Sequence, residues 1–319
     1  MTETIGPYRV RELLGKAGQS AVYTAEAPEG RTVAIKLFPR RLADDPAAVE
    51  RFHRELRAIL PVSRHPNLVQ LLDTGQEGDR LYLVMEKVEG TSLDRLLKGR
   101  RLSLSEALTV MRGICRGLEA GHQHGLLHRS LTPRNVLVSP DFATVKLSDL
   151  GITGFETAAP SLTATLGTGE IRLGALYYLA PETLEGTGGA DARTDLYSAG
   201  VIFHEMVTGR TPGPRFALPS QVDPALSPAI DVVALRCLAR RPDERYANAG
   251  DLLAALERLE EILGLRTLTE IRGISQAGSR LLGGGGRVGE EGKRPLLLYA
   301  GLALLVLALL AGVGFWLAR

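Results

Sequence analysis

The sequence predicts an α+β chain with a strand-rich N-terminal lobe that carries one helix and a mainly helical C-terminal lobe. Three observations predict it. Between residues 8 and 88, short β-branched and aromatic runs alternate with turn residues. A single segment with helical periodicity separates those runs, and helical periodicity dominates after residue 92. We therefore expect one bilobal domain over residues 8–263, divided into lobes 8–88 and 89–263.

The N-terminal lobe contains two clear strand candidates and one helix candidate. Val33–Phe38 and Arg80–Met85 are rich in β-branched and other apolar residues, which is typical of buried strands. Between them, residues 46–60 place apolar side chains at helical spacing, namely Val49, Phe52, Leu56 and Ile59. We expect an antiparallel sheet with this helix against it.

Helices alternate with one short strand pair in the C-terminal lobe. Ser103 stands three residues before Glu106, a capping-box pattern that predicts a long helix over 104–123. Short strands are predicted over 135–138 and 144–147, and an irregular segment over 151–173. Further helices are predicted over 195–208 and 228–239, and the last one ends near residue 263.

The composition bounds the class of protein. The chain has 319 residues, enough for a domain of about 260 residues and a tail. Its net charge of +2, from 38 basic and 36 acidic residues, argues against a general nucleic-acid binder. Cys115 and Cys237 lie far apart without metal-ligand spacing, so we expect two buried structural thiols in a reducing compartment.

A long uncharged run near the C-terminus predicts a membrane anchor. The run from Leu296 to Ala318 spans roughly 34 Å as a helix, against a bilayer core of about 30 Å. We expect a single-pass transmembrane helix over 295–318, with a buried core helix as the alternative. Lys293 and Arg294 precede it, so the positive-inside rule places the domain in the cytoplasm. The first ten residues are polar and predict no signal peptide.

Residues 264–294 form the predicted juxtamembrane linker. Four consecutive glycines, 283–286, make part of it a flexible spacer. Leu265, Leu268, Ile271 and Ile274, flanked by arginines, can instead form an amphipathic segment on the membrane or on the domain. The sequence leaves both alternatives open.

Several short motifs follow one another in an order that matters more than any one of them. They are Leu14–Tyr23, Val33–Lys36, Glu55, His128–Asn135, Asp149–Gly151, Ala180–Glu182, Asp195 and Arg245. In order and spacing this set resembles the signature of the protein kinase family, over about Tyr8 to Leu259. It is similar in kind to bacterial Ser/Thr kinases with a C-terminal membrane anchor. The resemblance implies a bilobal protein-kinase fold, ATP with Mg²⁺ (or Mn²⁺) as cofactors, and a protein partner or substrate in signalling.

The resemblance assigns a nucleotide and metal site. Lys36 is expected to reach the ATP phosphates, with Glu55 paired to it, and Asp149 and Asn135 to hold Mg²⁺. From the residues alone, Lys36 and Glu55 can also be unrelated surface charges, and Asp149 a turn-former before Gly151. The adenine is expected at the backbone of Glu86 and Val88. The remaining expected nucleotide-site residues are Gly15, Gly18, Val22, Ala34, Met85 and Leu137.

Ordinary core packing describes Val22, Ala34 and Leu137 equally well. Other matches imply structural or regulatory roles. Glu182 and Arg245 are expected to form a buried ion pair. Asp195 is expected to hold the catalytic-loop backbone, and His128 to belong to an interlobe packing spine. Arg129 can pair with a phosphate placed on one of the threonines of the irregular segment, namely Thr163, Thr165 and Thr168.

Three positions depart from the family pattern. Ser130 stands where the family has the Asp that accepts or orients the substrate hydroxyl. Thr132 replaces the Lys that contacts the transferring phosphoryl group, and Ala175 replaces a Thr that hydrogen-bonds both of those residues. The glycine-rich loop is also changed, since Ala17 and Ser20 occupy two glycine positions.

These departures favour a membrane-tethered pseudokinase that binds ATP and Mg²⁺ and presents a folded surface to a partner. An active Ser/Thr kinase of low turnover remains the alternative, because positioning alone can accelerate transfer. A small-molecule kinase of related fold and a structural anchor that binds no nucleotide also remain open.

Overall fold

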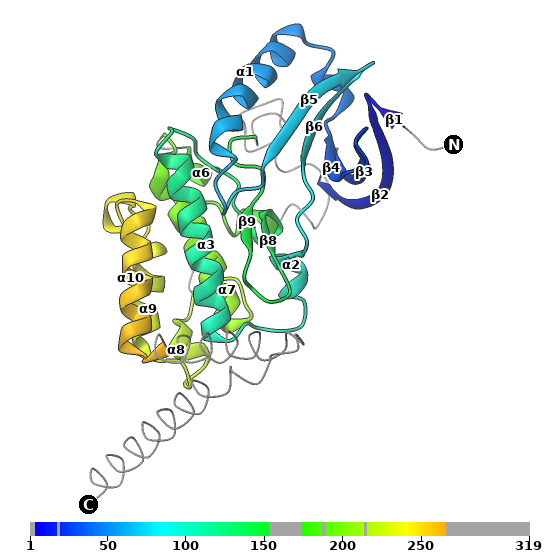
Figure 1. The fold of residues 1–319 in the computed structure, drawn as a ribbon. Helices are drawn as coiled ribbons and strands as arrows, with labels where there is room; N and C mark the ends of the chain where they lie inside the picture. The colour runs from blue at the N-terminus through cyan, green and yellow to red at the C-terminus, as the bar shows by residue number, and fades with distance from the viewer. Residues whose placement is uncertain (1–3, 18–19, 153–173, 187–188, 214–215, 266–319) are drawn as a thin grey trace, which may run out of the picture. The chain divides into compact units, whose positions relative to one another are not determined.

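The computed structural model describes residues 4–17, 20–152, 174–186, 189–213 and 216–265. These residues belong to one compact unit, Met1–Leu265. Within it, a strand-rich lobe precedes a helical lobe along the chain (Figure 1). The predicted α+β organisation in two lobes is therefore confirmed.

An antiparallel sheet forms the N-terminal lobe, with the strand order β1-β2-β3-β4-β6-β5. Its strands are β1 (Thr4–Ile5), β2 (Tyr8–Ala17), β3 (Ser20–Glu26), β4 (Thr32–Leu37), β5 (Leu71–Glu77) and β6 (Arg80–Glu86). Val33 and Ile35 of β4 pack into the core on one face of the sheet. The two-residue period of a strand therefore directs Ala34 and Lys36 to the opposite face, which carries the candidate site.

Helix α1 (Pro46–Val62) packs against β5 (Figure 1), after the short 3₁₀ turn η1 (Arg40–Leu42). Its start follows from the sequence, because Ala47 N donates to the Asp45 side chain (3.0 Å) and Pro46 occupies the first turn. Its buried positions recur at helical spacing, namely Phe52, Leu56, Ile59 and Val62. The helix predicted over 46–60 is confirmed.

The C-terminal lobe consists mainly of α2 (Leu93–Leu96), α3 (Leu104–His122), α6 (Pro181–Glu185), α7 (Ala192–Thr208), α8 (Pro219–Val222), α9 (Pro228–Cys237) and α10 (Ala249–Ile262), with the turn η4 (Pro242–Glu244). The predicted capping box begins α3, since Ser103 N donates to Glu106 Oε2 (2.8 Å) and Glu106 N to Ser103 Oγ (3.3 Å). Helix α7 begins three residues before the predicted start, because Asp191 caps it.

The C-terminal lobe also contains a small sheet with the strand order β7-β8-β9. Its strands are β7 (Thr91–Ser92), β8 (Val136–Val138) and β9 (Val145–Leu147), and the 3₁₀ turn η2 (Pro133–Asn135) leads directly into β8. Strands β8 and β9 run antiparallel, with Leu137 opposite Lys146. Since Asn135 precedes β8 and Asp149 follows β9, the pairing brings these two residues to the same end of the hairpin.

Both cysteines are fully buried in the helical lobe, as predicted. Cys115 lies on α3 and Cys237 at the end of α9, where it packs tightly against Gly200 of α7. Burial raises the pKa of both thiols, that of Cys237 to about 12. Neutral, inaccessible thiols have a packing role.

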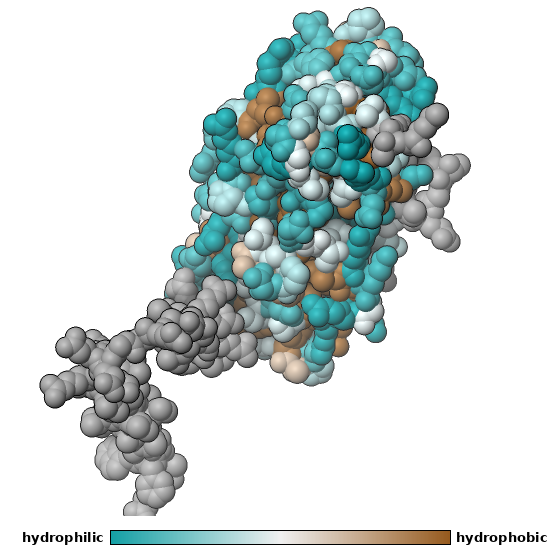
Figure 2. Space-filling model, turned by 45° about the vertical axis from the view of Figure 1, so that its right-hand side comes forward, coloured by the Kyte–Doolittle hydropathy of each residue, from teal (hydrophilic) through white to brown (hydrophobic). Residues whose placement is uncertain are grey.

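Hydrophilic residues cover most of the face drawn in Figure 2, and hydrophobic ones occur in small separate areas. Exposed large apolar side chains come from different elements, for example Leu14 of β2, Leu235 of α9 and Ile262 of α10. Among the described residues, no helix has the length and apolar character needed to cross a membrane. The predicted linker after Leu265 and the predicted membrane helix lie outside the described residues, so both stay predictions.

Candidate functional site

Lys36 carries the first charge of the candidate site. Its ammonium group donates to Asp149 Oδ1 at 2.8 Å, and only 3% of its side chain is exposed. A buried ammonium group is costly unless it is paired and hydrogen-bonded. The alternative of a surface lysine is therefore wrong, and β4 presents Lys36 to the residue that follows β9.

Asp149 is held from several sides. Besides Lys36, the Asn135 side-chain amide donates to its Oδ2 at 3.2 Å. Its backbone has a φ of +63°, a left-handed conformation that is uncommon for a residue other than glycine and that clusters at functional sites. Burial alone would raise the pKa of Asp149, but the Lys36 ammonium group and the Asn135 amide hold it below its usual range. The carboxylate is ionised near neutral pH, as a metal ligand must be.

Thr132 fixes the orientation of Asn135. Its hydroxyl donates to Asn135 Oδ1 at 2.9 Å, so the amide NH₂ faces Asp149. A chain of hydrogen bonds thus runs from Thr132 through Asn135 and Asp149 to Lys36. Thr132, which stands where the family has a lysine, therefore makes a hydrogen bond within the site.

Glu55 does not form the predicted ion pair with Lys36. It lies 3.9 Å from Arg51 Nε, one helical turn earlier on α1, with 40% of its side chain exposed. The predicted Lys36–Glu55 pair is wrong for this structure, because Asp149 takes the lysine and α1 presents Glu55 to solvent beside Arg51. In protein kinases that pair must be in place for transfer, and positioning of this helix controls it.

The loop that carries Ser130 is held by Asp195. The carboxylate of Asp195, which is 1% exposed, accepts from His128 N (2.8 Å) and Arg129 N (2.7 Å). Its Oδ2 also lies 2.8 Å from His122 Nε2. Arg129 has a φ of +62°, the second left-handed residue of the site. The predicted role of Asp195 in holding this backbone is confirmed.

His128 and Arg129 differ in exposure. His128 is fully buried, which lowers its pKa, whereas Arg129 is exposed. Ser130 follows as a half-buried residue and precedes the fully buried Leu131. A serine hydroxyl carries no charge and accepts a proton poorly near neutral pH, so a firmly held loop here presents a weak base.

The residues predicted to surround adenine gather in one apolar cluster. Ala34 and Met85 are buried in it, and Val22, Val88 and Leu137 pack against it with partial exposure. Val22 and Ala34 come from the sheet, whereas Leu137 comes from β8 of the other lobe. Among the described residues, the backbone of Val88 makes no hydrogen bond, so its donor and acceptor remain available.

The glycine-containing loop is described only in part. Gly15 lies in β2 opposite Val22, and a side chain built there would meet no atom within 4 Å. Ser20, at a family glycine position, is buried and pairs with Ala17 at the end of the hairpin. Gly18 lies outside the described residues, as do Thr163, Thr165 and Thr168.

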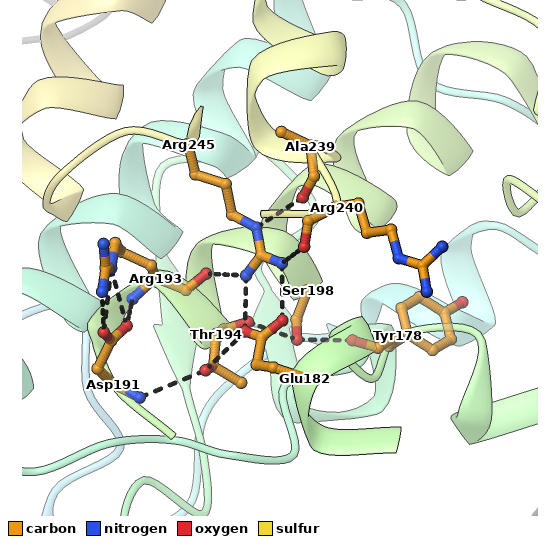
Figure 3. Close-up of polar contacts among 9 residues, drawn as sticks. All are labelled: Tyr178, Glu182, Asp191, Arg193, Thr194, Ser198, Ala239, Arg240 and Arg245. Atoms are coloured by element: carbon orange, nitrogen blue, oxygen red, sulfur yellow. Dashed lines mark hydrogen bonds and ion pairs between the residues drawn. The ribbon is translucent and has the colours of Figure 1, made fainter. Parts of the chain in front are cut away.

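Glu182 and Arg245 form the predicted buried pair (Figure 3). Nη1 and Nη2 of Arg245 each donate to one carboxylate oxygen of Glu182 at 2.8 Å, and the Arg245 side chain is fully buried. The remaining guanidinium hydrogens reach the carbonyl oxygens of Ala239, Arg240 and Arg193. Burial would raise the pKa of Glu182, but Arg245 and Thr194 hold it below its usual range. The pair joins α6 to the loop before α10.

Lys146 was not among the site residues predicted from the sequence. This residue of β9 donates to Glu86 Oε1 at 2.7 Å, next to the backbone predicted to take adenine. The sequence does contain a signal for it. Lys146 stands between the buried Val145 and Leu147, as Lys36 stands between two buried apolar residues. It also stands three residues before Asp149.

Comparison with known proteins identifies the family of this chain. A family model described as "Protein kinase domain" matches residues 8–249. The chain is similar to the serine/threonine-protein kinase PknH of Mycobacterium tuberculosis, with 36% identity over 80% of this chain and 42% of the relative. It is also similar to the serine/threonine-protein kinase Pkn1 of Myxococcus xanthus, with 34% identity over 79% of this chain and 38% of the relative. The chain thus spans about two fifths of the length of these relatives.

A solved structure agrees with this result. The crystal structure of the Mycobacterium tuberculosis PknI kinase domain is similar over 81% of this chain and 97% of that chain, with a TM-score of 0.64 and 25% identity. The match covers nearly all of that kinase domain and supports the bilobal protein-kinase fold.

Proposed function

Because the chain belongs to the protein kinase family, we propose that it binds ATP with Mg²⁺ between its two lobes and is impaired in phosphoryl transfer. The observation that carries this proposal is a contrast within one site. The buried Lys36 is connected by hydrogen bonds to the half-buried Asp149 and Asn135, whereas the adjoining loop offers Ser130 in place of an acidic base.

The donor set fits Mg²⁺ bound together with a nucleotide. Mg²⁺ prefers oxygen ligands and is usually held by one or two carboxylates plus substrate phosphates. Asp149 supplies an ionised carboxylate and Asn135 a carboxamide beside it. The remaining ligands would be phosphate oxygens of the nucleotide and water.

Each residue of the network has a role when nucleotide is bound. Mg²⁺ neutralises phosphate charge, and Lys36 offers a second positive charge from β4. Asn135 must turn its carbonyl oxygen toward the metal, which leaves its NH₂ facing Thr132. A threonine hydroxyl can donate or accept, so Thr132 satisfies the amide in both orientations. A lysine in its place could only donate.

Impaired transfer is supported by three side chains. Ser130 lacks the charge of a carboxylate, Thr132 is engaged with Asn135, and Ala175 has no hydroxyl to join them. General-base catalysis contributes on the order of a hundredfold to ten-thousandfold in rate. The exposed position of Glu55 is a further obstacle, because transfer needs the lysine–glutamate pair.

Incubation of the purified full-length chain with labelled ATP and Mg²⁺ or Mn²⁺ tests this proposal. We expect nucleotide binding with transfer to protein substrates at background level. Robust transfer that disappears in the Lys36→Met variant would overturn the impaired-transfer part. Absence of ATP binding at millimolar concentration would overturn the rest.

An active kinase of low turnover is the second candidate, and the intact loop geometry favours it. Asp195 still fixes the backbone around Ser130, and Asp149 keeps its left-handed conformation. Positioning of reactants can lower the barrier by several kcal/mol without any base. This candidate requires phosphate on the purified chain, for example on Thr163, Thr165 or Thr168, which mass spectrometry detects.

The membrane anchor belongs to the same proposal. The uncharged run from Leu296 to Ala318, preceded by Lys293 and Arg294, supports a single-pass helix with the kinase domain in the cytoplasm. The chain then acts on, or is recognised by, a protein partner at the membrane surface. Membrane fractionation of the full chain and of a variant that lacks residues 295–319 tests this, with loss of membrane association expected only in the variant.

A further inference from the structure

Lys146 is a half-buried lysine that the proposed chemistry does not use. It occupies the middle of β9, and 17% of its side chain is exposed. It lies directly opposite Leu137 in the β8–β9 pair. Residues opposite each other in an antiparallel pair project to the same face, so Lys146 shares the face of β9 that adjoins the apolar cluster around Ala34 and Met85.

The ammonium group of Lys146 forms an ion pair with Glu86. It donates to Glu86 Oε1 at 2.7 Å and to the carbonyl oxygen of Leu68 at 3.1 Å. The same carboxylate oxygen accepts from Gln70 N at 2.8 Å, and Glu86 N donates to Gln70 O at 2.9 Å. Glu86 is therefore fixed through both its side chain and its backbone.

The segment between these partners also pairs with β9. Leu147 N donates to Asn67 O and Val69 N donates to Leu147 O, each at 2.9 Å. The contacts of Lys146 therefore complete a hydrogen-bonded network that connects β9, residues 67–70 and the end of β6. One strand thus leads to Asp149 at its end and holds Glu86 through its middle residue.

We propose that Lys146 is a positioning residue that fixes the backbone at Glu86 and Val88 for adenine and so sets a preference for adenine over guanine. This inference rests on the proposed binding of ATP. At the edge that meets this backbone, adenine offers an acceptor at N1 and a donor at N6, whereas guanine offers a donor at N1 and an acceptor at O6. A rigid backbone discriminates between these patterns, and a loosened one adapts to both.

Binding of ATP, GTP and inorganic tripolyphosphate to the full-length chain tests this role, with Mg²⁺ present throughout. In Lys146→Met we expect the Kd for ATP to rise up to about tenfold, the size expected when one adenine–backbone hydrogen bond is lost. The Kd for GTP should change far less, so the ATP-to-GTP preference falls. Tripolyphosphate binding, which bypasses the base, should not change. Lys98→Met removes an exposed lysine as the matched control.

Rescue separates positioning from general destabilisation. Lys146→Arg keeps the charge and the donors and should restore most of the preference for ATP. If Lys146→Met fails to fold, Glu86→Gln removes the ionic partner from the other side, and the same loss of preference is expected.

An unchanged ATP-to-GTP preference in whichever of these variants folds overturns the inference while ATP binding by the wild type stands. Failure of the wild type to bind ATP overturns the proposed function and the inference together. The two failures are therefore distinguishable.

Discussion

At the scale of single residues, Ser130, Thr132 and Ala175 are the three positions that depart from the family pattern. Thr132 holds Asn135 in this structure, so it does more than leave a position without a cation. The loop around Ser130 keeps its anchorage to Asp195, so the backbone that a family aspartate requires is present. The departures from the family pattern lie in the side chains, so replacing those side chains tests the proposed impairment.

We expect Ser130→Asp combined with Thr132→Lys and Ala175→Thr to raise phosphoryl transfer at least a hundredfold. The aspartate restores a base, and the lysine restores a charge for the transferring group. Labelled ATP with a generic protein substrate measures the gain. The same triple variant with Lys36→Met is the control and should remain at background. No gain in a folded triple variant would contradict the view that the remaining site is intact.

At the scale of elements, the ion pair between Glu182 and Arg245 joins α6 to the segment before α10. Loss of one partner from a buried pair leaves an uncompensated charge and typically costs about 3–5 kcal/mol. We expect Glu182→Ala to lower the free energy of unfolding by about that amount, measured by urea unfolding at pH 7. Arg240→Ala is the matched control, because its partner Glu185 is exposed.

The same pair predicts a pH dependence. The folded-state pKa of Glu182 lies below its usual value, so the pair stabilises the fold above the unfolded pKa of about 4.3. That stability is lost as the pH falls through the folded pKa. The urea midpoint of the wild type should therefore fall more steeply below pH 4 than that of Glu182→Gln. Parallel profiles would contradict this assignment.

Patterns local in the sequence predicted the helices and strands well. The site was predicted less completely, because its contacts depend on how elements far apart in the sequence pack together. The capping box at Ser103 and the periodicity of α1 depend on neighbours in sequence, so both were predictable. Asn135 and Asp149 were found by motif, and their contact follows from the pairing of β8 with β9. Whether Glu55 faces Lys36 depends on how α1 sits against the sheet, which spacing along the chain does not encode.

At the scale of the whole molecule, both lobes supply residues to the proposed nucleotide site, so nucleotide binding there would be linked to global stability. A ligand that binds only the native state stabilises it by about 2.7 kcal/mol at a hundred times its Kd. For a domain of this size, each kcal/mol shifts the midpoint by about 2–4 °C. We expect saturating ATP with Mg²⁺ to raise the thermal midpoint by several degrees.

Two single variants test whether this shift of the thermal midpoint comes from binding at the proposed nucleotide site. Lys36→Met should reduce it with or without metal, because the lysine faces the phosphates directly. Asp149→Asn should remove only the part that depends on Mg²⁺, since the uncharged amide is a weaker ligand for a hard cation. Adenosine should give a smaller shift that Asp149→Asn leaves unchanged. An equal shift in all three proteins would place the nucleotide elsewhere, because neither Lys36 nor Asp149 would then contribute to its binding.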